Sequence, residues 1–183
     1  MTRRDVRLPA AIATVALIFL GGLAVTFVPR ERTPAAAAAA ARPRPHAAEI
    51  DERFRQGVVM LHAKKYEYAI AAFHQVLKYA PDMPEAHVNM GYALVGLGHH
   101  AQARDFFESA TVLRPGQANA YYGMAMALEG LGDLRGAIGA MRTYVHLVPR
   151  EDPHRRKAEA AVWEWEEAVR ATAAGDAKPR GKQ

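Results

Sequence analysis

The 183-residue chain has no cysteine and carries 24 Lys and Arg against 19 Asp and Glu, a formal net charge of +5. The missing cysteines exclude disulfides, cysteine nucleophiles and covalent haem attachment through a Cys-x-x-Cys-His site. The excess positive charge lies at the two ends, because residues 49–171 hold 14 basic and 16 acidic side chains. A phosphate-binding groove needs clustered cations, so this composition does not favour nucleic-acid binding.

The amino-terminal part contains a long apolar stretch. Residues 8–28 lack any charged side chain, and as a helix they would span about 31 Å, close to the hydrocarbon thickness of a bilayer. A cleaved signal peptide is the alternative, because three arginines precede the stretch, but the apolar core of a signal peptide is usually about 7 to 15 residues long. We therefore expect a retained transmembrane helix, a signal-anchor, with residues 1–7 in the cytoplasm.

Two segments lack the pattern of a packed core. Residues 29–47 contain seven consecutive alanines flanked by prolines and no large apolar residue, which is typical of a spacer. Residues 172–183 are rich in Ala, Gly and Lys, and we expect them to form a disordered tail. The folded core is therefore expected between these two segments.

Residues 48–151 repeat one pattern every 34 residues, in the units 50–83, 84–117 and 118–151. Such a period predicts a solenoid in which each unit buries its apolar face against its neighbours. Gly98 and Gly132 stand where a tight turn between two helices favours positive φ. The recurring positions are the small residues Gly57, Gly91 and Ala125, the alanines Ala69, Ala103 and Ala137, the large residues Phe73, Phe107 and Met141, and the prolines Pro81, Pro115 and Pro149.

This pattern resembles the tetratricopeptide repeat, a 34-residue unit of two antiparallel helices. The resemblance implies an all-α helical solenoid of three helix-turn-helix repeats. A further helix, predicted over residues 152–171, would cap the last repeat, with Asp152 as N-cap and Pro153 in the first position. Trp163 falls on the opposite side from the apolar stripe, where it is either an inconsequential exposed side chain or a secondary contact for a partner. That stripe comprises Ala158, Ala161, Val162, Trp165, Ala168 and Val169.

The sequence contains no recognisable active site. It lacks a Gly-rich phosphate loop and the His-Glu-x-x-His and Gly-x-Ser-x-Gly motifs, and its eight histidines show no spacing typical of zinc ligands. We therefore expect no enzyme activity, no cofactor, no metal site and no nucleic-acid partner.

The resemblance implies instead a concave groove, lined by the first helix of each repeat, that binds a protein or peptide. The lining positions are apolar and aromatic, which favours an apolar or amphipathic segment, while Asp51, Glu85 and Glu129 would select basic flanks. In the alternative interpretation, the carboxy-terminal helix of this chain or a second copy fills the groove. The predicted groove residues are Phe54, Val58, Leu61, Val88, Tyr92, Val95, Tyr122, Met126 and Glu129.

One anchor followed by a short repeat domain resembles envelope assembly proteins of bacteria, including the repeat subunits that present apocytochrome to the cytochrome c haem lyase. This architecture implies a single-pass protein of the bacterial inner membrane whose repeats lie in the periplasm and work as a scaffold or assembly factor. A self-associating repeat protein that organises a membrane structure is the rival interpretation.

Overall fold

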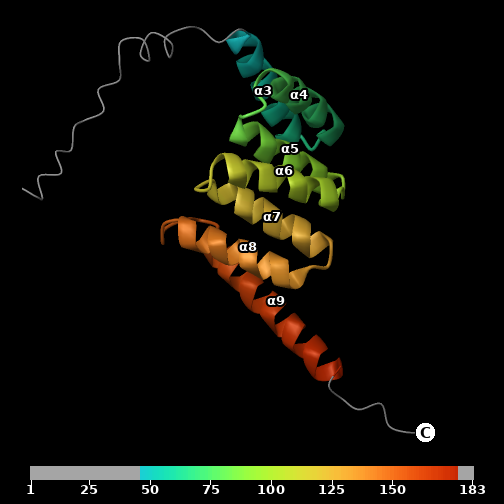
Figure 1. Cartoon of the computed structure of the whole chain (residues 1–183), viewed down its shortest axis with the longest axis vertical. Coiled ribbons are helices and arrows are strands. Elements are labelled where there is room, and N and C mark those ends of the chain that lie inside the picture. The colour runs from blue at the N-terminus through green and yellow to red at the C-terminus, as the bar shows by residue number, and fades with distance from the viewer. Residues whose placement is uncertain (1–45, 177–183) are drawn as a thin grey trace, which may run out of the picture. The chain divides into compact units, whose positions relative to one another are not determined.

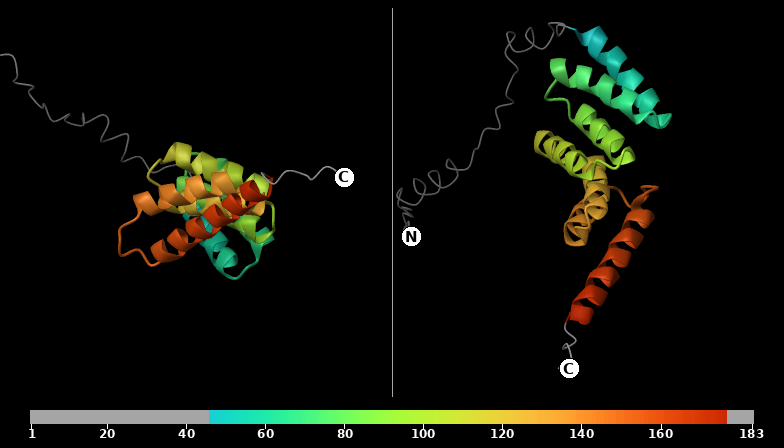
Figure 2. Two further views of the ribbon diagram at one scale, coloured as in Figure 1. Left: turned by 90° about the horizontal axis from the view of Figure 1, so that it is seen from below. Right: turned by 90° about the vertical axis from the view of Figure 1, so that its right-hand side faces the viewer.

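The computed structural model describes residues 46–176, which form seven α-helices. Helices α3 and α4, α5 and α6, and α7 and α8 form three pairs that stack in chain order, and α9 packs on α8 (Figure 1). Figure 2 shows the stacked helices from two further directions. This number and order of helices confirms the prediction of a solenoid with three helix pairs and a final helix. The helices are α3 (Ala47–His62), α4 (Tyr66–Tyr79), α5 (Pro84–Gly96), α6 (His100–Leu113), α7 (Ala118–Gly130), α8 (Leu134–Leu147) and α9 (Arg155–Asp176).

The turns inside the pairs use residues with positive φ. Gly98 joins α5 to α6 with φ 77°, and Gly132 joins α7 to α8 with φ 78°, as their positions in the sequence predict. The equivalent position between α3 and α4 is held by Lys64, whose φ is 57°. A side chain with a Cβ atom costs about 1 to 2 kcal/mol in this conformation, so the first turn is the strained one of the three.

The interior of the solenoid depends on a close approach between a small residue and an aromatic ring. A Cβ atom added to Gly57 would lie 2.5 Å from the ring of Phe73, and one added to Gly91 would lie 2.7 Å from the ring of Phe107. Both rings are fully buried. In the third pair the equivalent residues are Ala125 and Met141, both buried. A flexible methionine leaves room for the Cβ atom that a phenylalanine excludes.

Helix α9 begins and ends later than the sequence predicts. It starts at Arg155, because the carboxylate of Asp152 is held in the preceding turn, where it accepts hydrogen bonds from the Tyr144 hydroxyl at 2.7 Å and the His154 amide at 2.9 Å. It ends at Asp176, so the first five residues of the predicted disordered tail are helical. The alanine-rich sequence there favours the longer helix. Ala168, predicted to join the apolar stripe of this helix, is exposed.

Several predictions concern residues that the structure does not describe. The cytoplasmic segment 1–7, the anchor 8–28 and nearly all of the spacer 29–47 lie outside the described residues. Within residues 46–176, no helix has both the length and the apolar character that crossing a membrane requires.

Candidate peptide-binding site

The predicted groove residues come from the first helix of each pair, and these three helices are neighbours. Helix α5 contacts α3 on one side and α7 on the other. Because the repeat is 34 residues long, equivalent residues form rows across the three helices, for example Val58, Tyr92 and Met126. We call the set formed by Phe54, Val58, Leu61, Tyr92, Val95, Tyr122, Met126 and Glu129 the first-helix face.

The α3 and α5 part of this face carries half-buried apolar side chains. Phe54 contacts the buried ring of Phe73 edge to face, with 5.8 Å between the ring centroids. Val58, Leu61 and Val95 pack their inner sides against the same core and keep part of their surface exposed. This part of the face therefore offers apolar surface to a partner without any helix having to move.

Val88 was predicted to line the groove, and the structure corrects that prediction. Its side chain is only 1% exposed and belongs to the central core. Helix α5 has a helix on either side, which covers a short side chain at this position. The larger Phe54 and Tyr122, which hold the same register in α3 and α7, remain half-exposed.

Tyr92 joins two repeats. Its hydroxyl donates a hydrogen bond to the backbone carbonyl of Asn119 at 2.8 Å, and its ring lies edge to face against Phe107 at 5.1 Å. Burial raises the pKa of its hydroxyl far above the usual range, so Tyr92 stays protonated and keeps donating this bond. Tyr92 therefore stabilises the contact between the second and third repeats, whether or not it also touches a partner.

Helix α9 contacts the α7 end of the face. The indole nitrogen of Trp165 donates a hydrogen bond to the carboxylate of Glu129 at 2.9 Å, and Arg142 of α8 pairs with Glu166 at 2.6 Å. A cavity of about 330 Å³ between α7, α8 and α9 is lined by Tyr122, Met126 and Trp165 among others. Helix α9 therefore contacts this end of the face, while Glu129 stays exposed and Tyr122 and Met126 stay half-buried.

Trp163 and Trp165 are separated as the helical pattern predicts. Trp165 is 6% exposed within the core formed by α8 and α9, whereas Trp163 is 66% exposed. The structure places Trp163 in solvent, outside the residues that line the cavity beside α9. Its role as a secondary contact remains a prediction.

Sequence reasoning missed the hydrogen bond between Trp165 and Glu129. The apolar stripe of the last helix does predict that Trp165 packs inward. The partner of its indole nitrogen could not be read from the sequence, because the two residues are 36 positions apart and outside the repeat period.

Two family models of the tetratricopeptide repeat match the sequence, one over residues 60–112 and the other over residues 88–156. The chain belongs to the tetratricopeptide repeat family. Together the two matches cover residues 60–156, from the end of α3 to the start of α9, and so include the second and third repeats found by their 34-residue period. Among proteins with curated descriptions, none matches the chain by sequence.

Solved structures of other tetratricopeptide repeats share this fold. The Sgt2 domain from Aspergillus fumigatus superposes with a TM-score of 0.67 at 23% identity, covering 78% of this chain and 94% of that one. The first domain of Spaghetti (RPAP3), bound to an HSP90 peptide, gives 0.63 at 19% identity, with 70% and 98% covered. PcrH in complex with the chaperone binding region of PopD gives 0.63 at 17% identity, with 67% and 94% covered.

Proposed function

We propose that this tetratricopeptide repeat protein is a non-catalytic scaffold that binds an apolar or amphipathic segment of a protein partner on its first-helix face. The observation that carries the proposal is the row of half-buried apolar side chains on α3 and α5, which no other described helix covers. Two proteins of the same fold were solved with a bound peptide or a partner region, the Spaghetti domain and PcrH, which supports the proposal.

The position of α9 narrows the surface that a partner can use. Because Trp165 bonds to Glu129 and α9 lines the cavity beside Met126, α9 restricts access to the α7 end of the face. A bound segment therefore contacts mainly α3 and α5, through side chains such as Phe54, Val58 and Val95. An apolar face of this kind buries few polar groups of the protein, so apolar side chains of the partner supply most of the affinity.

The experiment compares two matched pairs of substitutions in the intact protein. Val58→Gln with Val95→Gln places amides on the first-helix face, while Val59→Gln with Val112→Gln makes the same change at side chains that are 59% and 76% exposed. A partner that the wild type and the second pair capture, and the first pair does not, supports the proposal. Equal capture by both pairs refutes it, provided that thermal melts show both variants folded.

Tyr92 is left unchanged in this test because its substitution has a structural cost. Its hydroxyl bonds to the third repeat and its ring packs on Phe107, so a loss of binding by Tyr92→Ala with Tyr122→Ala would not separate recognition from folding. Tyr122 has the same difficulty, because its ring contacts that of Tyr144 at 5.1 Å.

We further propose that residues 8–28 anchor the scaffold in a bacterial inner membrane with the repeats in the periplasm, where it acts as an envelope assembly factor, for example in cytochrome c biogenesis. The uncharged stretch supports the anchor. A retained anchor predicts that the protein stays in the membrane fraction after a carbonate wash and keeps its original amino terminus. Recovery of a soluble, shortened protein would identify a cleaved signal peptide instead.

The rival function is a self-associating scaffold that organises a membrane structure. The exposed side chains on α9, among them Trp163, are the surface on which a second copy could dock. Light scattering of the full-length protein distinguishes the two: a monomer is expected for the scaffold that binds another protein, and an oligomer for the self-associating one.

A further inference from the structure

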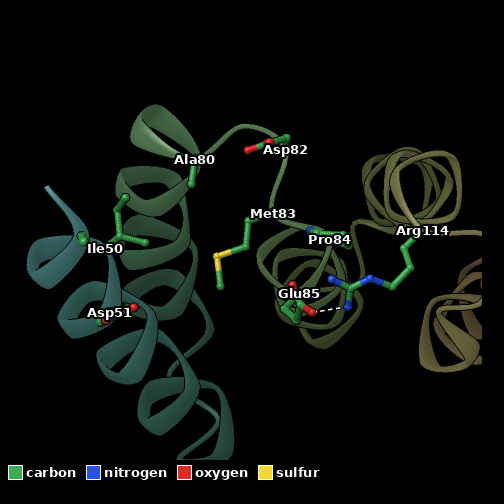
Figure 3. A pocket seen from close by; sticks show the side chains of 9 residues that line it. Ile50, Asp51, Ala80, Asp82, Met83, Pro84, Glu85 and Arg114 are labelled. Atoms are coloured by element: carbon green, nitrogen blue, oxygen red, sulfur yellow. Dashed lines mark hydrogen bonds and ion pairs between the residues drawn. The ribbon is translucent and has the colours of Figure 1, made fainter. Parts of the chain in front are cut away.

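A cavity of about 340 Å³ lies where the amino-terminal ends of α3 and α5 meet the turn between α4 and α5 (Figure 3). Its apolar lining includes Ile50 and Met83, and Met83 lies between the two helices in Figure 3. Three carboxylates also line the cavity, those of Asp51, Asp82 and Glu85. The cavity thus combines an apolar floor with acidic side chains.

The charge of this cavity is largely uncompensated. Arg114 is the one cation that lines it, and this side chain forms an ion pair with Glu85 and donates a hydrogen bond to Gln117 at 2.9 Å. Within residues 46–176, neither Asp51 nor Asp82 takes part in an ion pair or a side-chain hydrogen bond. Within these residues the two carboxylates therefore have no bonded partner, and the nearest charge interaction is that of Asp51 with Arg55, one turn along α3.

The cavity continues the first-helix face towards the helix starts. Asp51 and Glu85 hold equivalent positions in the first and second repeats, one turn before Phe54 and Val88. The opposite end of the face differs, because the carboxylate of Glu129 already accepts a hydrogen bond from Trp165. Of the three carboxylates predicted to select basic flanks, Asp51, Glu85 and Glu129, only Asp51 has no ion pair or side-chain hydrogen bond within residues 46–176.

We infer that this cavity receives a lysine or arginine side chain of the bound segment, next to the apolar residues that the first-helix face holds. The inference rests on the proposed function and adds the chemistry and direction of the partner. The aliphatic part of a lysine or arginine packs against Ile50 and Met83, while its charge approaches Asp51 and Asp82. A segment with an acidic residue at this point is rejected by the same two carboxylates.

A purely structural role for these carboxylates makes a different prediction. Acidic residues in the first turn of a helix stabilise its dipole, which gives Glu85 such a role in α5. Asp51 lies just beyond the first turn of α3 and interacts there with Arg55. In that case their neutralisation lowers the melting temperature and leaves peptide preference unchanged. Asp82 lies in the turn, two residues before the start of α5, and is close enough for the dipole of that helix to act on it as well.

The test is a selection of random 12-residue peptides, displayed on phage, on the full chain purified in a mild detergent. We expect enriched peptides to carry Lys or Arg beside apolar residues. A selected peptide should bind about fivefold more tightly than its Arg→Gln version, and Asp51→Asn with Asp82→Asn should remove that difference. The matched control is Glu67→Gln with Glu108→Gln, which changes the net charge equally on the exposed surface of second helices.

Each outcome of the selection decides one point. Enriched peptides that are apolar without a basic residue overturn the inference and leave the proposed function standing. A basic preference that the control pair also abolishes is non-specific attraction and overturns the inference as well. Failure to enrich any peptide contradicts both proposals. Oligomers of the chain that Asp51→Asn with Asp82→Asn dissociates would make a second copy the occupant, which likewise refutes a separate basic partner.

Discussion

Replacing Gly91 by alanine tests the close contact that sets the spacing of each helix pair. The added Cβ atom would lie 2.7 Å from the ring of Phe107, whereas carbon atoms in contact normally stand about 3.5 to 4.0 Å apart. The ring or the helix must therefore shift by about 1 Å, and overpacking of this kind costs about 1 to 3 kcal/mol. Alanine recovers about 1 kcal/mol of helix propensity, so we expect a net loss of up to about 2 kcal/mol.

The third repeat indicates how to relieve this contact. Phe107→Met reproduces the combination of Ala125 and Met141, and in that background Gly91→Ala should be neutral or stabilising by up to about 1 kcal/mol. Gly139→Ala is the control, because a Cβ atom added there meets nothing within 4 Å; it should stabilise the protein. Urea unfolding of the four variants, followed by circular dichroism, measures the coupling. An equal loss from Gly91→Ala in both backgrounds would refute the reasoning.

Three further predictions follow from buried or strained residues. Ala103→Leu, at a fully buried helix crossing, should lower the free energy of unfolding by about 1 to 3 kcal/mol, and an unchanged thermal melt would contradict the repeat register. Lys64→Gly removes a Cβ atom from a residue with φ 57° and should raise the melting temperature; a lower one would show that the turn needs the lysine side chain. The hydrogen bond from Tyr144 lowers the pKa of Asp152, so this carboxylate contributes stability above its unfolded pKa of about 3.9, which is lost as the pH falls through the lower folded value. Asp152→Asn should therefore melt earlier than the wild type at neutral pH, with the difference shrinking in acid, and a constant difference would argue against the linkage.

The fold could be predicted because each of the three repeats needs the same close crossing of its two helices. A glycine that recurs with an aromatic residue 16 positions later, as Gly91 does with Phe107, indicates a close helix crossing. The departures were harder to interpret. Ala125 looks like an exception in the sequence, and the structure shows that it accompanies Met141 in the same core. Lys64 stands where the other two repeats have a glycine. Only its positive backbone φ shows that this turn is strained.

The binding face was less predictable, because the helical register determines which way a side chain points and not what covers it. Val88 has the register of a groove residue and is buried, since a helix stands on both sides of α5. Tyr92 also stands at a groove position, and its hydroxyl donates a hydrogen bond to the backbone of the next repeat. Glu129 was predicted to select basic flanks of a partner, yet its carboxylate accepts the indole hydrogen bond of Trp165. Each of these outcomes depends on a neighbour outside the residue's own repeat.

The contact of α9 with the α7 end also limits the length of segment that the site can bind. Neighbouring packed helices have axes about 8 to 10 Å apart, so a path from the acidic cavity across α3 and α5 to the edge of α7 measures about 20 Å. An extended segment covers this distance with about six residues, and a helix needs about 13. Because a 12-residue peptide reaches nearly the whole path in either conformation, the selected sequences also report the conformation. Basic and apolar positions two residues apart indicate an extended segment, and a spacing of three or four indicates a helix.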